Sequence, residues 1–137
     1  MQVAVNSKGI PIELKFKIKN IFNFPVQLYF PRDKDAFAKG IYIVGADNFG
    51  YKPREMAGKP ISETFEYFGL TPNEEMIWEY EVEDLVLSFD EHIKMRGFVR
   101  VSFASLLYLD KDNSGIENFM NFERLRARVT WNGDIKQ

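Results

Sequence analysis

The sequence predicts an all-β protein, an antiparallel sandwich of about seven strands. Short segments alternate between apolar and polar residues, which is the period of a strand with one buried and one solvent-facing side. Glycine, proline and asparagine separate these segments at short intervals. Helical patterning is confined to two brief segments, 33–38 and 88–95, each long enough for a turn or two. Many short strands with frequent turns are typical of a sandwich.

The first three expected strands are short and clearly bounded. The first, 12–19, alternates four apolar residues with one glutamate and three lysines. The second, 26–30, alternates up to Pro31, a residue that cannot continue the hydrogen-bond ladder of a strand. The third, 41–44, is the sequence IYIV between two glycines. Their β-branched and aromatic residues favour strand over helix.

Four further strands are expected after a loop rich in glycine and proline. The fourth, 65–68, is short and is expected at a sheet edge. The fifth, 76–82, places Trp, Tyr and Val on one face and glutamates on the other. The sixth, 98–109, is long and follows Gly97. The seventh, 122–131, alternates apolar residues with three arginines. Period two in each segment indicates a half-buried strand.

Length and composition indicate one globular domain over residues 1–137. Hydrophobic residues make up 45% of the chain and the formal net charge is -2, so we expect neither nucleic acid nor a membrane surface as a partner. Cysteine is absent, which excludes disulfides and thiolate metal sites. The opening residues do not match a signal peptide. We therefore expect a soluble cytoplasmic protein, or a secreted or periplasmic one if a leader was removed.

Three segments carry a resemblance to known domains: LTPNE at 70–74, DLVLSFD at 84–90 and GFVRV at 97–101. Their order resembles the later half of the immunoglobulin-like domain beside deuterolysin-type zinc peptidases. Similar spacing occurs in intracellular proteinase-inhibitor domains, which are also sandwiches. The resemblance spans about residues 12 to 103 and implies an immunoglobulin-like sandwich. Asn73 replaces the usual glycine, and Phe89 and Phe98 replace tyrosines.

The run LDKDNSGIE at 109–117 resembles the first half of a calcium loop. Asp110, Asp112 and Ser114 occupy its first, third and fifth positions, and a glycine follows. The twelfth position is Asn121, which cannot supply the bidentate carboxylate that such a loop needs. A polar turn between two strands explains the same residues. We therefore expect no metal site and no cofactor.

No motif indicates catalysis. His92 is the only histidine, and its spacing suggests no serine partner. The chain lacks the His-Glu-x-x-His motif of zinc peptidases and any glycine-rich phosphate loop. Neighbouring acidic residues occur in expected loops, where no facing pair is indicated. We therefore expect a protein that is not an enzyme and has no catalytic residues.

Charged rows lie on the solvent-facing sides of two expected strands. Lys15, Lys17 and Lys19 follow one strand, and a glutamate row follows 76–82. In an immunoglobulin-like sandwich, the second and fifth strands are antiparallel neighbours. We expect the segments 12–19 and 76–82 to take these two positions. We therefore expect the lysines to face Glu79, Glu81 and Glu83 across the two strands.

Alternation fails near the end of the sixth strand, where 106–109 is apolar throughout. A bulge or an overlying loop would explain this, as would an apolar surface for a partner protein or a second copy. We expect a protein-binding or accessory module that acts through a sheet edge or the hairpin end near 106–122. The alternative is a proteinase inhibitor, or another enzyme-blocking protein, that uses an exposed loop such as 45–63 or 110–118. The candidate partner-binding residues are Leu107, Leu109, Phe119, Met120, Phe122, Arg124, Arg126 and Arg128.

Overall fold

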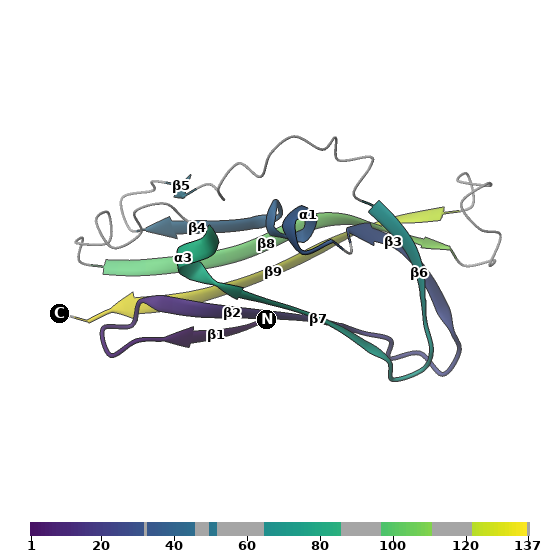
Figure 1. The fold of residues 1–137 in the computed structure, drawn as a ribbon, viewed down its shortest axis with the longest axis horizontal. Coiled ribbons are helices and arrows are strands. Elements are labelled where there is room, and N and C mark those ends of the chain that lie inside the picture. The colour runs from purple at the N-terminus through teal and green to yellow at the C-terminus, as the bar shows by residue number, and fades with distance from the viewer. Residues whose placement is uncertain (32, 46–49, 52–64, 86–96, 111–121, 137) are drawn as a thin grey trace.

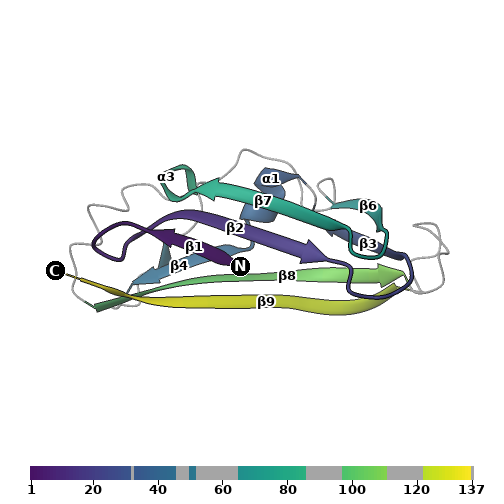
Figure 2. The same cartoon turned by 90° about the horizontal axis from the view of Figure 1, so that it is seen from below.

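The chain folds into two antiparallel β-sheets that face each other (Figure 1; Figure 2). The computed structural model describes residues 1–31, 33–45, 50–51, 65–85, 97–110 and 122–136. The smaller sheet has the order β1-β2-β7, with strands Gln2–Val5, Pro11–Lys19 and Glu75–Glu81. The all-β sandwich expected from the sequence is confirmed.

The larger sheet is built around the long strand β8 (Gly97–Asp110). Strand β9 (Phe122–Ile135) pairs with β8 along its whole length, without a shift in register. Strands β3 and β4 both pair with β8, at Tyr108–Asp110 and Val99–Phe103 respectively, so they share its other side. The remaining bounds are β3 Val26–Pro31, β4 Ile41–Gly45, β5 Gly50–Tyr51 and β6 Phe65–Leu70.

Helix α1 (Lys34–Ala38) interrupts the chain between β3 and β4. Asp33 caps it, because its side-chain oxygen accepts hydrogen bonds from the backbone N–H groups of residues 35 and 36. One turn of helix places Phe37 between the sheets. Its ring stacks on Trp78 of β7 at 4.2 Å and on Phe103 of β8 at 4.3 Å. The helix therefore supplies the ring that joins the two sheets.

Aromatic packing dominates the core around Phe37. Phe16 and Phe30 meet its ring edge-on, at 5.2 and 5.8 Å between centroids. Both rings are almost fully buried. Edge-to-face and stacked pairs each add about 0.5–1.5 kcal/mol beyond the area that they bury. Four phenylalanines, Phe16, Phe30, Phe37 and Phe103, thus pack together where the sheets meet.

All seven expected strands lie close to their expected positions, and 33–38 contains α1. The described residues add two short strands, β1 and β5, that the sequence did not predict. Residue 82 was expected to end the fifth strand and Glu83 to lie on its charged face, but both lie in a helical turn, α3 (Val82–Leu85). The second expected helical segment, 88–95, lies outside the described residues.

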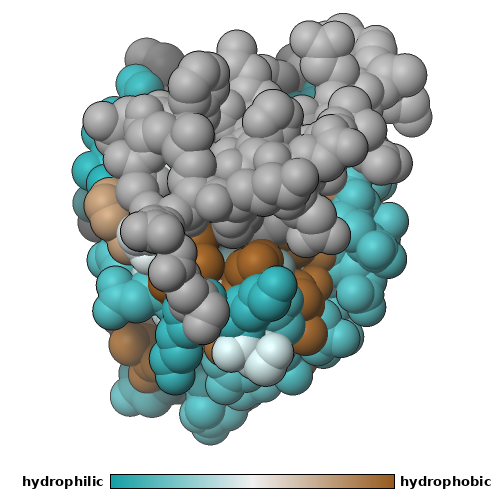
Figure 3. All heavy atoms as spheres, turned by 90° about the vertical axis from the view of Figure 1, so that its left-hand side faces the viewer, coloured by the Kyte–Doolittle hydropathy of each residue, from teal (hydrophilic) through white to brown (hydrophobic). Residues whose placement is uncertain are grey.

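At the left-hand end of Figure 1, hydrophobic residues lie between hydrophilic flanks (Figure 3). No described helix is long and apolar enough to cross a membrane.

Candidate protein-binding surface

The outer face of the smaller sheet carries matched charges. Strands β2 and β7 are antiparallel neighbours, as expected. Lys15 contacts Glu79 at 3.5 Å. Lys17 and Lys19 both contact Glu75, at 3.6 and 3.9 Å. Each lysine of this row therefore has a carboxylate within ion-pair distance.

The predicted ladder was wrong for two of its three glutamates. Glu81 lies opposite Glu13 rather than opposite a lysine. Glu83 lies in α3, because the strand ends at residue 81. Glu75, which the prediction left out, forms ion pairs with two of the lysines. The sequence pattern identified the strand pair but not its register.

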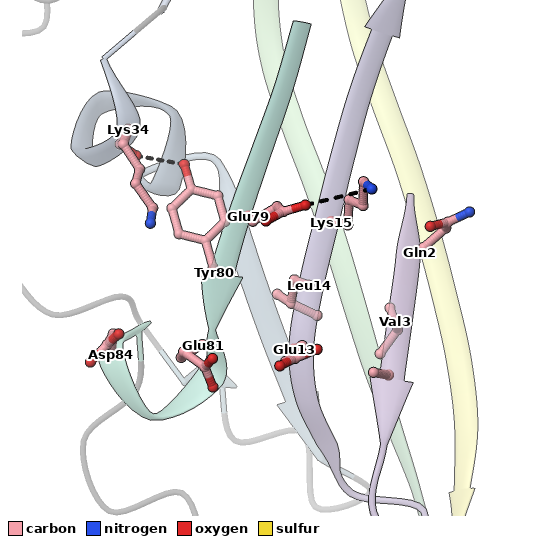
Figure 4. A pocket seen from close by; sticks show the side chains of 11 residues that line it. Gln2, Val3, Glu13, Leu14, Lys15, Lys34, Glu79, Tyr80, Glu81 and Asp84 are labelled. Carbon is pink, nitrogen blue, oxygen red and sulfur yellow. Dashed lines mark hydrogen bonds and ion pairs between the residues drawn. The ribbon is translucent and has the colours of Figure 1, made fainter.

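A surface depression of about 650 Å³ lies at the end of this face (Figure 4). Glu13, Glu81 and Asp84 line it, together with the ion pair between Lys15 and Glu79. All three carboxylates are exposed to solvent, where water screens each charge. The described residues contain no group of His, Cys, Asp or Glu arranged to hold a metal ion. The depression carries no catalytic assignment.

Tyr80 lines the same depression and connects β7 to α1. Its hydroxyl donates a hydrogen bond of 2.6 Å to the backbone carbonyl of Lys34 (Figure 4). Burial raises the pKa of Tyr80 well above its ordinary value, and the charges of Asp35 and Asp33 raise it further. The phenol therefore stays protonated and acts as a structural donor.

The outer face of the larger sheet has a different charge arrangement. Arg124, Arg126 and Arg128 of β9 are all exposed on this face, and we call them the arginine row. Their side chains point away from the core, because the alternate residues Ala127 and Val129 pack against it. Among the described residues, no ion pair involves the arginine row. This cationic surface is not neutralised from within the described chain.

The cross-strand neighbours of the arginine row are uncharged. Arg124 lies opposite Tyr108, Arg126 opposite Leu106, and Arg128 opposite an alanine. Leu106 and Tyr108 are half-buried on this outer face. Arginine stems can cover such apolar groups while the guanidinium remains in water. Strand β8 contains no bulge against β9, so the apolar run at 106–109 simply places residues on both faces.

The other sequence-predicted site residues are not all on this surface. Leu107 and Leu109 point inward, are partly buried and pack against the core. Phe122 begins β9, and its backbone lies opposite Asp110. Phe119 and Met120 lie outside the described residues. The structure thus brings the three arginines together on one face and places the two leucines beneath it.

The calcium-loop and histidine hypotheses fall largely outside the described residues. Asp110 is the only loop ligand candidate that is described, and it is 2% exposed at the end of β8. Asp112, Ser114 and Asn121 lie outside the described ranges, as does His92.

Sequence analysis missed an apolar loop between β2 and β3. Ile21, Phe22 and Phe24, which we call the apolar loop, are 82%, 50% and 54% exposed. The two phenylalanine rings stack at 5.1 Å. Exposed apolar side chains that cluster in this way form a candidate contact surface. The signal in the sequence was an inter-strand segment, NIFNFP, that is unusually apolar for a loop.

A buried asparagine holds the apolar loop in place. Asn20 is 3% exposed, and its side-chain amide donates to the carbonyls of Phe24 and Leu70 at 3.0 and 2.9 Å. Its side-chain oxygen accepts a 2.9 Å hydrogen bond from the backbone of Phe22. All polar groups of the amide are thus engaged in fixing the loop against the end of β6.

The turn after β6 completes this end of the molecule. Asn73 has a φ of 67°, the left-handed conformation that asparagine tolerates. Thr71 donates hydrogen bonds to the Glu74 carboxylate from both its backbone and its hydroxyl. These two donors lower the pKa of Glu74. This turn links β6 to β7, with asparagine in the left-handed position.

Comparison of the chain with protein-family models, curated proteins and solved structures gives no match. The resemblance drawn from the sequence motifs therefore stays a prediction.

Proposed function

We propose that this chain is a non-catalytic protein-binding module that acts through the outer face of β8 and β9. The observation that carries the proposal is the arginine row, which has no ion-pair partner among the described residues. Half-buried Leu106 and Tyr108 beside it add apolar contact area. Interfaces combine such features, since arginine and aromatic residues are enriched at their energetic centres. Acidic groups on a partner would complement this face.

The test compares partner capture by three proteins. The wild type, R124E/R126E/R128E and K15E/K17E/K19E are immobilised and exposed to extract of the source organism. The two variants make the same change in net charge on opposite faces, and circular dichroism verifies that each is folded. We expect one or more proteins to be retained by the wild type and the lysine variant but lost from the arginine variant. Retention by all three, or by none, would overturn the proposal.

The sandwich type is part of the same proposal. We infer an immunoglobulin-like arrangement, with β1, β2 and β7 in one sheet facing β9, β8 and the shared β3–β4 position in the other. This order matches strands A, B and E against G, F and C of that fold.

The apolar loop favours a second candidate function, an enzyme-blocking protein such as a proteinase inhibitor. A loop held by Asn20 loses little conformational entropy when it enters a cleft. Phe22→Asp should abolish inhibition of any protease that the wild type inhibits. Ile77→Ser is the control, since Ile77 is 48% exposed on β7 and lies outside the loop. A panel of serine, cysteine and metalloproteases left fully active by the wild type would reject this candidate.

A further inference from the structure

Among the described strands, β9 leaves one long edge of the larger sheet unpaired. It pairs with β8 over all 14 of its residues and, in the described part of the chain, with no other strand. The views of Figure 1 and Figure 2 agree in placing it at the border of its sheet. In an antiparallel strand, alternate residues direct their backbone N–H and C=O groups to opposite sides. Half of the backbone groups of β9 therefore point away from β8, as at any sheet edge.

A backbone hydrogen bond between described residues connects the opposing sheet to one end of this border. Near the end of β9, Lys136 donates a 2.7 Å backbone hydrogen bond to Lys8, in the turn between β1 and β2. Strand β1 has four residues, far fewer than β9, and its turn is fixed at that end. Leu125, towards the other end of β9, is 37% exposed although it lies on the core side. Among the described residues, nothing pairs with this edge where the arginine row lies.

The two faces of this open edge differ in chemistry. The arginine row lies on the outer face, at every second residue. Leu125, Ala127 and Val129 alternate with it on the inner face and are exposed or half-buried. An extended segment laid beside β9 would also alternate its side chains between these faces. The complementary segment has acidic residues on one side and apolar residues on the other.

We infer that the edge of β9 accepts an added strand from a partner whose residues alternate between acidic and apolar. This inference rests on the proposed function and names the chemistry of its partner. Main-chain hydrogen bonds to β9 supply affinity, and the alternate side chains supply specificity. Carboxylates lie across from the arginine row, while apolar side chains extend the core beside Leu125.

A second copy of this chain does not fit the same edge. Antiparallel pairing of two β9 strands would place one arginine row beside the other, and like charges directly opposite are destabilising. A nucleic acid could meet the guanidinium groups, but it has no backbone N–H and C=O groups to continue the sheet. The charge pattern and the open backbone together select an acidic peptide strand.

Synthetic peptides test the inference directly by calorimetry. The probe is acetyl-EVEVEVEV-amide, and the control, acetyl-EEEEVVVV-amide, has the same composition without alternation. We expect the alternating peptide to bind at least about tenfold more tightly than the control, because only it satisfies both faces at once. R124E/R126E/R128E should weaken its binding by roughly 100-fold, since three cross-strand ion pairs become repulsive. K15E/K17E/K19E should leave it unchanged.

Methylation of the peptide's backbone nitrogens distinguishes binding by strand addition from binding by charge attraction alone. One peptide is N-methylated at every glutamate and another at every valine, so each blocks one edge of the peptide strand. Strand addition requires that one of the two still binds while the other does not, and the outcome gives the strand direction. Equal binding by both methylated peptides, or by the alternating and block peptides, would overturn strand addition.

The outcomes distinguish this inference from the proposed function. If the peptides do not bind as an added strand, but the arginine row is still needed to capture a protein, only the inference of strand addition is overturned. Capture that is independent of the arginine row would overturn the proposed function as well. Tighter binding of a single-stranded oligonucleotide than of the peptide would overturn the choice of partner. So would a dimer in light scattering that R124E/R126E/R128E converts to a monomer.

Discussion

The two outer faces of the sandwich carry cation rows of equal length, but the carboxylates of the described residues match only one of them. On β2, each of the three lysines lies within 4.0 Å of a glutamate on β7. On β9, the neighbours across from the arginines are Tyr108, Leu106 and Ala104. Both rows come from strands of period two, so alternation alone does not distinguish a neutral face from a cationic one.

The difference lies in what the neighbouring strand supplies. A cross-strand ion pair satisfies a charge locally and contributes roughly 0.2–1 kcal/mol to the fold. A row of like charges beside uncharged residues contributes nothing comparable and repels itself. The lysine row is therefore accounted for by folding, whereas the arginine row supports the proposed binding surface.

The largest effect on stability is expected at Phe37, the core residue that contacts both sheets. Phe37 stacks on Trp78 of one sheet and on Phe103 of the other. Phe37→Ala should lower the free energy of unfolding by about 3–5 kcal/mol, because it leaves a cavity between the sheets. Urea unfolding measures the change, with Phe37→Leu expected to cost less. A loss below about 1 kcal/mol would contradict the stacked arrangement.

Charge reversal should affect the stability of the two faces unequally. K15E/K17E/K19E should lower the free energy of unfolding by about 1–3 kcal/mol, since three attractive contacts become repulsive. R124E/R126E/R128E removes no ion pair among the described residues, so its free energy of unfolding should remain within about 0.5 kcal/mol of wild type. Urea unfolding at low ionic strength compares the two. Equal destabilisation would remove the distinction between the faces.

The sequence predicted the positions of the strands better than their pairing and register. Seven segments were found because alternation and turn residues report local geometry directly. The four-residue β1 was missed, since so short a segment carries little periodic signal. The register of β7 was missed for a different reason. Its glutamates extend into α3, and nothing local shows that the strand ends at Glu81.

The site was predicted in part, for the same physical reason. The arginines were found because they alternate along one strand. Whether a carboxylate faces them depends on β8, which adjoins β9 only in the folded chain. The role of Asn20 was equally hidden, because its amide bonds to Leu70, 50 residues away. Contacts of this kind depend on topology, which a single sequence does not report.

A smaller effect is expected at Tyr80, beneath the lysine-bearing face. Tyr80→Phe removes the hydrogen bond to Lys34 and should cost about 1 kcal/mol at pH 7. The folded protein holds the phenol proton more tightly than the unfolded chain, because burial raises the pKa. That stability is complete below about pH 10, the ordinary value, and declines above it.

The difference between wild type and Tyr80→Phe should therefore narrow as the pH rises above 10, since only the wild type loses this contribution. Urea unfolding at pH 7, 9 and 10.5 follows the difference. A gap that stays constant across this range would mean that the phenol is not protected in the fold.

The smallest effect gives the sharpest contrast between the two faces. Replacing one cation by glutamine should change the free energy of unfolding in opposite directions on the two faces. Lys17→Gln removes a pair with Glu75 at 3.6 Å and should lower the free energy of unfolding by about 0.2–0.5 kcal/mol. Arg126→Gln relieves repulsion from two arginines, each roughly 6.8 Å away along the strand, and should raise it by a few tenths. Both differences should shrink in 1 M salt, where the Debye length is about 3 Å. Urea midpoints at low and high salt resolve such shifts, and two changes of the same sign would show that the arginine row is matched after all.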